Sequence, residues 1–177
     1  MRSKFSILGH PIHPLLVAFP IGLFIWALVA DIVYFATSKH MMWYDMAFWA
    51  GTVAWIGGLV AALPGFGDYF TVAIKSDARR IATAHMVLNV AVVALFFVAW
   101  LLMLNNGAID GGRLTAVLIL HIIGVGFLGL SGWLGGEMAF RHHIGMVPED
   151  MEVETAEHMR HERAAGGMRP FGGAMHQ

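Results

Sequence analysis

The chain has 177 residues, the length of one ordinary domain, but 58% of them are hydrophobic and 13% are charged. Soluble domains have about 45–50% apolar and about 25% charged residues, so one core of this size cannot bury so much apolar surface. The net charge of −1 argues against nucleic-acid binding, and the absence of cysteine excludes disulfides, thiolate zinc sites and iron–sulfur ligation. The composition therefore predicts a protein whose main solvent is lipid.

Four apolar stretches are long enough to cross a bilayer, whose hydrocarbon core requires about 20 helical residues. They are expected at about residues 14–37, 45–63, 80–104 and 114–140, and Pro64 with Gly65 is expected to end the second. The first stretch is too long for the apolar region of a signal peptide and carries Asp31, so we interpret it as a retained helix. The sequence predicts an all-α fold, a four-transmembrane-helix bundle over residues 1–147.

Lysine and arginine are distributed unevenly about these spans, and basic residues in short loops mark the cytoplasmic side. The side with Lys39 and Arg113 holds only these two, whereas the side with both termini holds nine. The nine are Arg2, Lys4, Lys75, Arg79, Arg80, Arg141, Arg160, Arg163 and Arg169. We therefore expect both termini to be cytoplasmic. Residues 148–177 lack apolar periodicity and are expected to form a polar, mostly flexible tail.

Histidines gather where the chain enters and leaves the membrane on the cytoplasmic side. His10 and His13 each precede a proline, which favours an extended backbone and places both on one side of it. His85 in the third span and His142 after the fourth lie at the same depth, as does Glu137. Paired imidazoles suit haem iron, and imidazole with carboxylate suits transition metals. We predict that the four histidines bind haem b or a transition metal, with Glu137 as a further metal ligand. The alternative is that they only satisfy structural hydrogen bonds.

Two ionisable residues lie inside the opposite half of the membrane. Asp31 is near the far end of the first span, and His121 is about 10 Å in from the same surface at helical rise. Such residues mark functional sites by default, and proton relay is a common use. We predict that Asp31 faces the bundle and pairs with His121, either in proton transfer or as a structural hydrogen bond.

The two hairpins share a faint pattern. The first starts at His13 and ends with residues 67–70, and the second starts near His85 and ends with residues 136–140. Helix pairs in the same orientation imply a pseudo-twofold axis along the membrane normal. The fourth span is also rich in glycine, which either allows close helix packing or makes room for a flat ligand such as a porphyrin or quinone.

Several of these segments together resemble a bacterial family of predicted four-helix membrane proteins of unknown function. The resemblance covers about residues 5–147 and rests on residues 9–22, Asp31, residues 62–65, Arg79, Arg80, His85 and the run Gly132-Trp133-Leu134-Gly135-Gly136-Glu137. His10, His13, His85, Arg141 and His142 match the family pattern, whereas His121 does not obviously belong to it. Some relatives carry a Rieske-type iron–sulfur domain, which implies electron transfer near the membrane.

These observations favour an integral protein of the bacterial inner membrane, a haem- or metal-binding electron-transfer subunit rather than a stand-alone enzyme. Its expected partners are the lipid bilayer and a redox protein or quinone, and a homo-oligomer stays open. One alternative is a transition-metal binding or transport protein without a redox role. Another is a structural membrane partner. The sequence identifies no catalytic residue.

Overall fold

The computed structural model describes residues 6–8, 10–71, 76–104, 111–142, 157, 160 and 161. Four helices hold most of them: α1 (Ile12–Ala36), α2 (Met41–Thr71), α3 (Ser76–Leu104) and α4 (Gly111–Phe140). Each is long and apolar enough to cross a membrane. Ahead of α1, the two-residue strands β1 (Ser6–Ile7) and β2 (His10–Pro11) pair in antiparallel fashion. The predicted all-α fold with four spans is confirmed. The predicted tail, residues 148–177, lies almost entirely outside the described residues.

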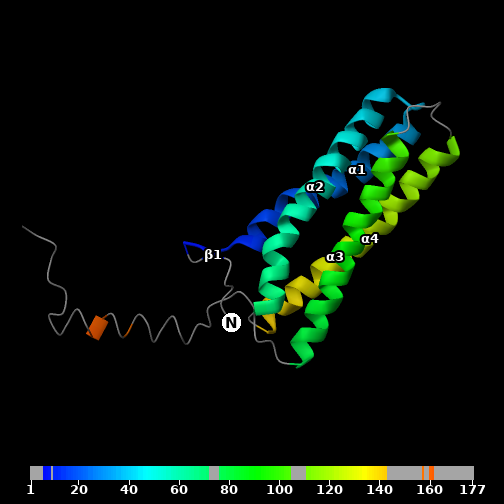
Figure 1. The fold of residues 1–177 in the computed structure, drawn as a ribbon. Helices are drawn as coiled ribbons and strands as arrows, with labels where there is room; N and C mark the ends of the chain where they lie inside the picture. The colour runs from blue at the N-terminus through cyan, green and yellow to red at the C-terminus, as the bar shows by residue number, and fades with distance from the viewer. Residues whose placement is uncertain are drawn as a thin grey trace, which may run out of the picture.

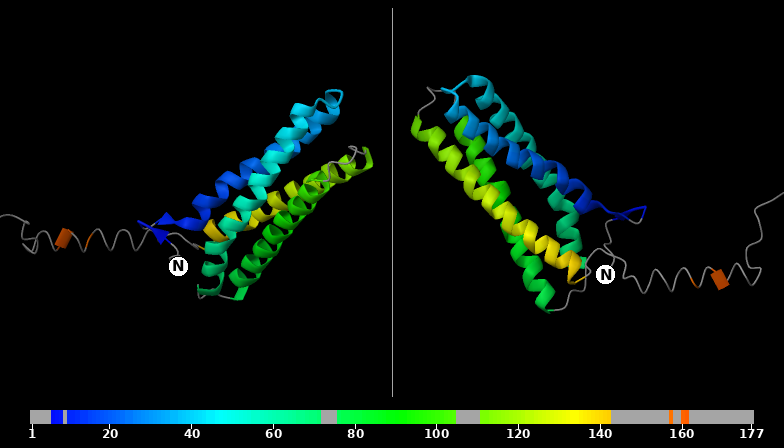
Figure 2. Two further views of the ribbon diagram at one scale, coloured as in Figure 1. Left: turned by 45° about the horizontal axis from the view of Figure 1, so that its top comes forward. Right: turned by 180° about the vertical axis from the view of Figure 1, so that it is seen from behind.

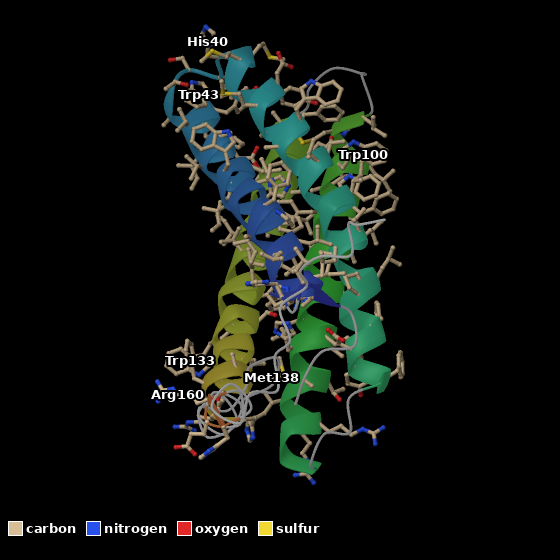
Figure 3. The ribbon with its side chains drawn as sticks, turned by 90° about the vertical axis from the view of Figure 1, so that its left-hand side faces the viewer. His40, Trp43, Trp100, Trp133, Met138 and Arg160 are labelled. Atoms are coloured by element: carbon tan, nitrogen blue, oxygen red, sulfur yellow. The ribbon has the colours of Figure 1, made fainter. Side chains whose placement is uncertain are left out.

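The helices form two antiparallel hairpins, α1–α2 and α3–α4, which lie side by side (Figure 1). Packing is closest within each hairpin, and α2 against α3 and α1 against α4 join the two (Figure 2). The start of α1 and the end of α4 lie at one end of the bundle, here named the terminal end. The opposite end, with the turn between α1 and α2, is named the loop end. Figure 3 shows His40 and Trp43 at the loop end and Trp133 at the terminal end.

The second helix continues through Pro64 to Thr71, so the predicted end at residue 63 was wrong. Proline lacks an N–H and disturbs the carbonyls of the preceding turn. Within a membrane such a break is tolerated where a neighbouring side chain supplies a donor. Here His13 Nδ1 of α1 lies 2.8 Å from the Ala61 carbonyl oxygen, one turn before Pro64. The missing N–H of Pro64 leaves the Val60 carbonyl without its partner, and the His13 contact binds the next carbonyl of the same turn, so α1 supports α2 where the proline weakens it.

The segment before α1 also differs from the prediction. His10 lies in β2, whereas His13 is already in the first turn of α1, so the two do not share an extended run. Leu8 adopts a positive φ of 51° in the turn between the strands. Pro14 fits the first helical turn because an N–H there has no partner within the helix. The expected placement of His10 and His13 on one side of an extended segment was therefore wrong.

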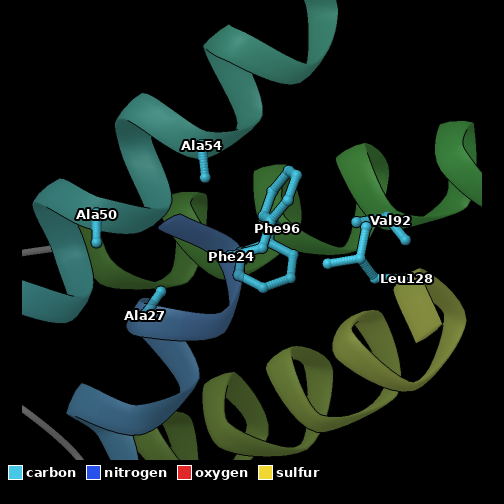
Figure 4. Packing of buried hydrophobic residues seen from close by; sticks show 7 residues of the cluster. All are labelled: Phe24, Ala27, Ala50, Ala54, Val92, Phe96 and Leu128. Atoms are coloured by element: carbon cyan, nitrogen blue, oxygen red, sulfur yellow. The ribbon is translucent and has the colours of Figure 1, made fainter. Parts of the chain in front are cut away.

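The core lies on the axis between the two hairpins. The Phe24 and Phe96 rings meet there with centroids 4.4 Å apart, between Ala54 of α2 and Leu128 of α4 (Figure 4). Small residues allow this approach, because helices in lipid associate through close packing rather than through a hydrophobic driving force. Gly124 of α4 faces the Phe96 ring directly. The centre of the bundle is thus closed by apolar side chains.

The faint pattern shared by the two hairpins extends to burial. Buried positions recur with the same spacing in α1 and α3, and again in α2 and α4. They are Pro20, Phe24, Ala27 and Asp31 against Val92, Phe96, Ala99 and Met103, and Ala47, Gly51, Ala54 and Ala61 against Val117, His121, Gly124 and Ser131. This correspondence supports the pseudo-twofold axis, which runs between Phe24 and Phe96. It also assigns to each site residue an equivalent position in the other hairpin.

Gly124 tests how tightly this centre is packed. A Cβ added at Gly124 would lie 2.7 Å from Phe96 Cε2, whereas a Cβ at Gly126 meets nothing within 4 Å. We expect Gly124→Ala to destabilise the protein by about 1–3 kcal/mol, because the ring must move in a full core. Gly126→Ala should be neutral or stabilising by about 0.5–1 kcal/mol. Unfolding in mixed detergent micelles measures both, and equal effects would contradict the packing described.

Candidate functional site

Asp31 and His121 form one polar pair inside the bundle. Asp31 of α1 is 6% exposed and His121 of α4 is 1% exposed. His121 Nδ1 lies 2.5 Å from Asp31 Oδ2, and the imidazole stacks on Phe96 with ring centroids 4.2 Å apart. The structure therefore makes the contact that equal depth in the membrane predicted. At this distance a proton lies between nitrogen and oxygen, since neither atom tolerates the other's lone pair so close.

Further polar groups lie between this pair and the loop end. Tyr34 is one turn beyond Asp31 in α1 and is buried. Tyr44 of α2 donates its hydroxyl to the Met103 carbonyl oxygen at 2.9 Å, and its ring centroid lies 6.2 Å from that of Tyr34. Asp31 and Arg113 both act electrostatically on Tyr44, so all of these groups share one neighbourhood.

The terminal end holds a second polar site, built on His13 and His85. His13 Nδ1 lies 2.8 Å from the Ala61 carbonyl oxygen, and its ring lies against Gly65, one turn further along α2. His85 Nδ1 of α3 lies 2.8 Å from the Ser131 carbonyl oxygen. Each imidazole must be the donor, because a carbonyl oxygen only accepts. Both histidines therefore carry the proton on Nδ1 and leave the lone pair on Nε2.

The second hairpin repeats this arrangement closely. The His85 ring lies against Gly135, one turn beyond Ser131, as His13 lies against Gly65 one turn beyond Ala61. His13 and His85 each stand about three helical turns before Phe24 and Phe96, on the inner faces of α1 and α3. The two imidazoles are close enough to interact electrostatically. The pseudo-twofold axis thus pairs them across the mouth of the bundle.

Asn89 adds a contact that only His85 has. Its Nδ2 lies 3.0 Å from His85 Nε2 and 2.7 Å from Ser131 Oγ. Ser131 Oγ also lies 2.9 Å from His85 Nδ1, so a small hydrogen-bonded network joins α3 and α4. Asn89 corresponds to Val17 in the first hairpin, which has no polar side chain. His85 is therefore held from both nitrogens.

Two of the other predicted ligands, His10 and Glu137, have local partners. His10 is exposed, and its Nδ1 lies 3.2 Å from the Leu8 carbonyl oxygen of its own turn. Glu137 pairs with Arg141 one turn further along α4, with 3.0 Å between Oε1 and Nη1. In the part of the chain that the structure describes, no three His, Asp or Glu side chains are grouped to hold a metal ion. A metal site built from His10, His13, His85, His142 and Glu137 is therefore not assembled.

Two kinds of site residue were missed from the sequence. Gly65 and Gly135 provide flat surfaces for the imidazoles, and their signal was a glycine one turn beyond each acceptor carbonyl. Tyr34 and Tyr44 gather near Asp31, and depth in the membrane could have indicated them. The depth of histidines and acids in the membrane does not by itself identify the glycines and tyrosines that position them.

The chain matches one protein family over residues 9–148, described as predicted membrane protein (DUF2231). The matched segment includes all four helices and every site residue described above. No curated protein and no solved structure matches the chain. The chemistry of the sites is therefore argued from their residues alone.

Proposed function

The chain belongs to this family of predicted membrane proteins, and we propose that it is the membrane subunit of an electron-transfer system, in which His13 and His85 would hold a haem b. The observation that carries the proposal is the symmetric pair of imidazoles, each with Nδ1 hydrogen-bonded to a backbone carbonyl. Histidines that bind metals almost always donate their other N–H in this way, which fixes the ring and leaves Nε2 as the ligand.

The chemistry of the donor set suits haem better than a bare ion. A haem iron takes at most two protein ligands, for which a pair of imidazoles suffices, whereas other protein metal sites usually need three or four ligands. The described residues offer two histidines across the axis and no group of three. This comparison also weakens the alternative of a metal transporter built on the same cluster.

The terminal end is the more open part of the bundle. His13, Gly65, His85 and Gly135 are only half-buried, whereas all four helices have buried inner positions further toward the centre of the bundle. Those deeper positions are Pro20, Ala61, Val92 and Ser131. A flat ring would therefore meet less packing at the level of the histidines than anywhere further in. To expose the His85 Nε2 lone pair, the Asn89 amide would turn away and keep its bond to Ser131 Oγ.

When bound, the group would supply a one-electron redox centre within the membrane. His13 and His85 would hold it, and the backbone carbonyls of Ala61 and Ser131 would raise the basicity of both rings. The electron partner is proposed to be a redox protein or a quinone. The proposed location is the bacterial inner membrane with both termini in the cytoplasm, the side favoured by Arg79, Arg80 and Arg141.

The absorbance spectrum of the protein purified in detergent tests this proposal. We expect a Soret band in the oxidised protein and a sharp α-band after reduction with dithionite, at about one haem per chain. Metal analysis of the same sample tests the alternative that the protein binds or transports a transition metal without a redox role. A colourless protein that retains a transition metal would contradict the haem proposal and support the metal-binding alternative. A colourless protein without metal would support the structural alternative.

A further inference from the structure

We propose that Asp31 and His121 form a proton-binding site that exchanges one proton with the loop end of the bundle only. The site is separate from the histidines of the terminal end, and the inference does not depend on haem. At helical rise, His13 lies about 27 Å from Asp31 along α1, and His85 lies about 16 Å along α3 from Phe96, on which His121 stacks. It starts from two ionisable side chains buried in contact within a segment that spans a membrane. A structural hydrogen bond is the competing explanation.

The charge balance of the pair favours an exchangeable proton. With Nδ1 donating to an ionised Asp31 and Nε2 unprotonated, the pair carries one net negative charge. One proton added at His121 Nε2, the nitrogen away from Asp31, makes the pair neutral overall. A net charge in a low-dielectric interior is costly, so uptake of this proton is favoured by burial. The cation of Arg113 lies in the same neighbourhood and lowers the cost of the negative charge that the deprotonated pair carries.

The pseudo-twofold axis argues against a purely structural role. The positions equivalent to Asp31 and His121 are Met103 of α3 and Gly51 of α2, both buried. At these two positions the other half of the bundle therefore has a methionine and a glycine in place of the acid and the imidazole. A Cβ at Gly51 would meet Ala27 and Phe96 at 4.0 Å, which is ordinary contact. Since one half of the fold packs without an acid or an imidazole at these positions, the acid and the imidazole in the other half are not required by packing.

Groups on every neighbouring helix determine how the pair is reached. In α1 the titratable neighbour is Tyr34, and in α2 the neighbours are Tyr44 and Asp45. In α4 it is Arg113, near the helix start. All four groups lie on the loop side of the pair, because Tyr34 is near the end of α1 and the other three are near the starts of α2 and α4. From α3 the Phe96 ring faces the pair, since His121 stacks on it.

The opposite direction is closed. Toward the terminal end, Phe24, Val92, Phe96 and Leu128 form one buried apolar cluster with Ala54 across the bundle (Figure 4). No polar side chain belongs to this cluster. A proton that enters from the loop end therefore reaches His121 and returns by the same route. The site stores a proton and does not conduct it across the membrane.

Infrared and nitrogen NMR spectra of the full-length protein in lipid nanodiscs test the proton site. Across the pH range in which circular dichroism shows an intact fold, we expect the Asp31 carboxyl band and the His121 ring nitrogens to change together. Proton uptake should be about one per chain greater than in Asp31→Asn. His40→Phe, which alters an exposed group at the loop end that is not among these neighbours, should leave these changes intact. If the His121 nitrogens of the unaltered protein stay constant over this range, the pair is only a hydrogen bond and the proposal fails.

A vesicle experiment tests whether the site opens to one side. The protein is incorporated into phosphatidylcholine vesicles that enclose a pH-sensitive dye, and a pH step is applied outside. We expect the pH difference to decay no faster than in protein-free vesicles. Faster decay that is lost in Asp31→Asn would show a path through the apolar cluster and would overturn the one-sided site.

Discussion

Replacing His121 by phenylalanine should destabilise the protein by about 3–5 kcal/mol, more than most core substitutions, because it leaves the Asp31 carboxylate buried without its partner. Phenylalanine keeps a ring against Phe96, so the loss of stacking contributes little. Asp31→Leu leaves an unsatisfied imidazole instead, which costs about 1–3 kcal/mol. In the double variant neither polar group is left unpaired. Its loss should therefore be smaller than the sum of the two single losses, with a coupling of about 0.5–3 kcal/mol.

The pair formed by Glu137 and Arg141 is the matched control for this cycle. It joins an acid and a base over a similar distance, but the Arg141 side chain is 77% exposed. Exposed pairs contribute about 0–1 kcal/mol, so Arg141→Ala should change the unfolding free energy only slightly. Unfolding in mixed micelles, followed by circular dichroism, measures all of these variants. If the Asp31 and His121 losses add fully, the two residues are not coupled and their buried contact carries no special energy.

Depth along a helix is the information that the sequence provides well. The rise per residue placed Asp31 and His121 at one level from their distances to the span ends, and the contact followed because a polar group in lipid turns inward. The same argument placed His13 and His85 at the opposite end. The apolar runs predicted four spans because length and composition alone decide whether a helix crosses a bilayer.

What depth does not determine is which groups at one level actually meet. His10 and Glu137 were placed with His13 and His85, yet local partners hold both of them. The turn of β1 and β2 gives His10 a backbone carbonyl two residues away, and helical spacing gives Glu137 a guanidinium one turn away. Contacts this close in sequence form at little entropic cost, and they compete with a distant site for the same side chain. The end of α2 was misplaced for the opposite reason, since a residue on another helix stabilises the break at Pro64.

The pseudo-twofold axis separates what the two sites have in common from what is particular to each. The imidazole and carbonyl contact occurs in both hairpins, so the histidine site obeys the symmetry of the fold. The contact of Asp31 with His121 occurs once and replaces apolar residues of the other half. A cofactor on the pseudo-twofold axis would be bound by one equivalent residue from each hairpin. A proton site needs only one acid and one imidazole in contact. The proposed haem site therefore depends on two equivalent positions, and the proposed proton site depends on a contact that occurs in only one half of the bundle.

The proposed haem site makes a second strong prediction, for protein purified with the pigment that the proposal expects. His13→Ala and His85→Ala should each convert a six-coordinate low-spin spectrum into a five-coordinate high-spin one or lose the pigment, because each removes one of the two axial imidazoles. His10→Ala and His142→Ala should keep the low-spin spectrum, since His10 is held by its own turn and no contact joins His142 to the pair in the described part of the chain. Absorbance and electron paramagnetic resonance distinguish the two spin states.

Added imidazole makes this experiment specific for ligation rather than for folding. Alanine at position 13 or 85 leaves a space the size of the missing ring, bordered by Gly65 or Gly135. Free imidazole should enter that space and restore the low-spin spectrum in both variants, to a similar extent because the two surroundings are equivalent. Any weaker recovery at position 85 should come from the Asn89 amide, which competes with the iron for the ring nitrogen. Asn89→Val, which introduces the equivalent residue of the first hairpin, should remove this difference. A low-spin spectrum that survives both alanine variants would assign the iron ligands to other residues and end the proposal for this pair.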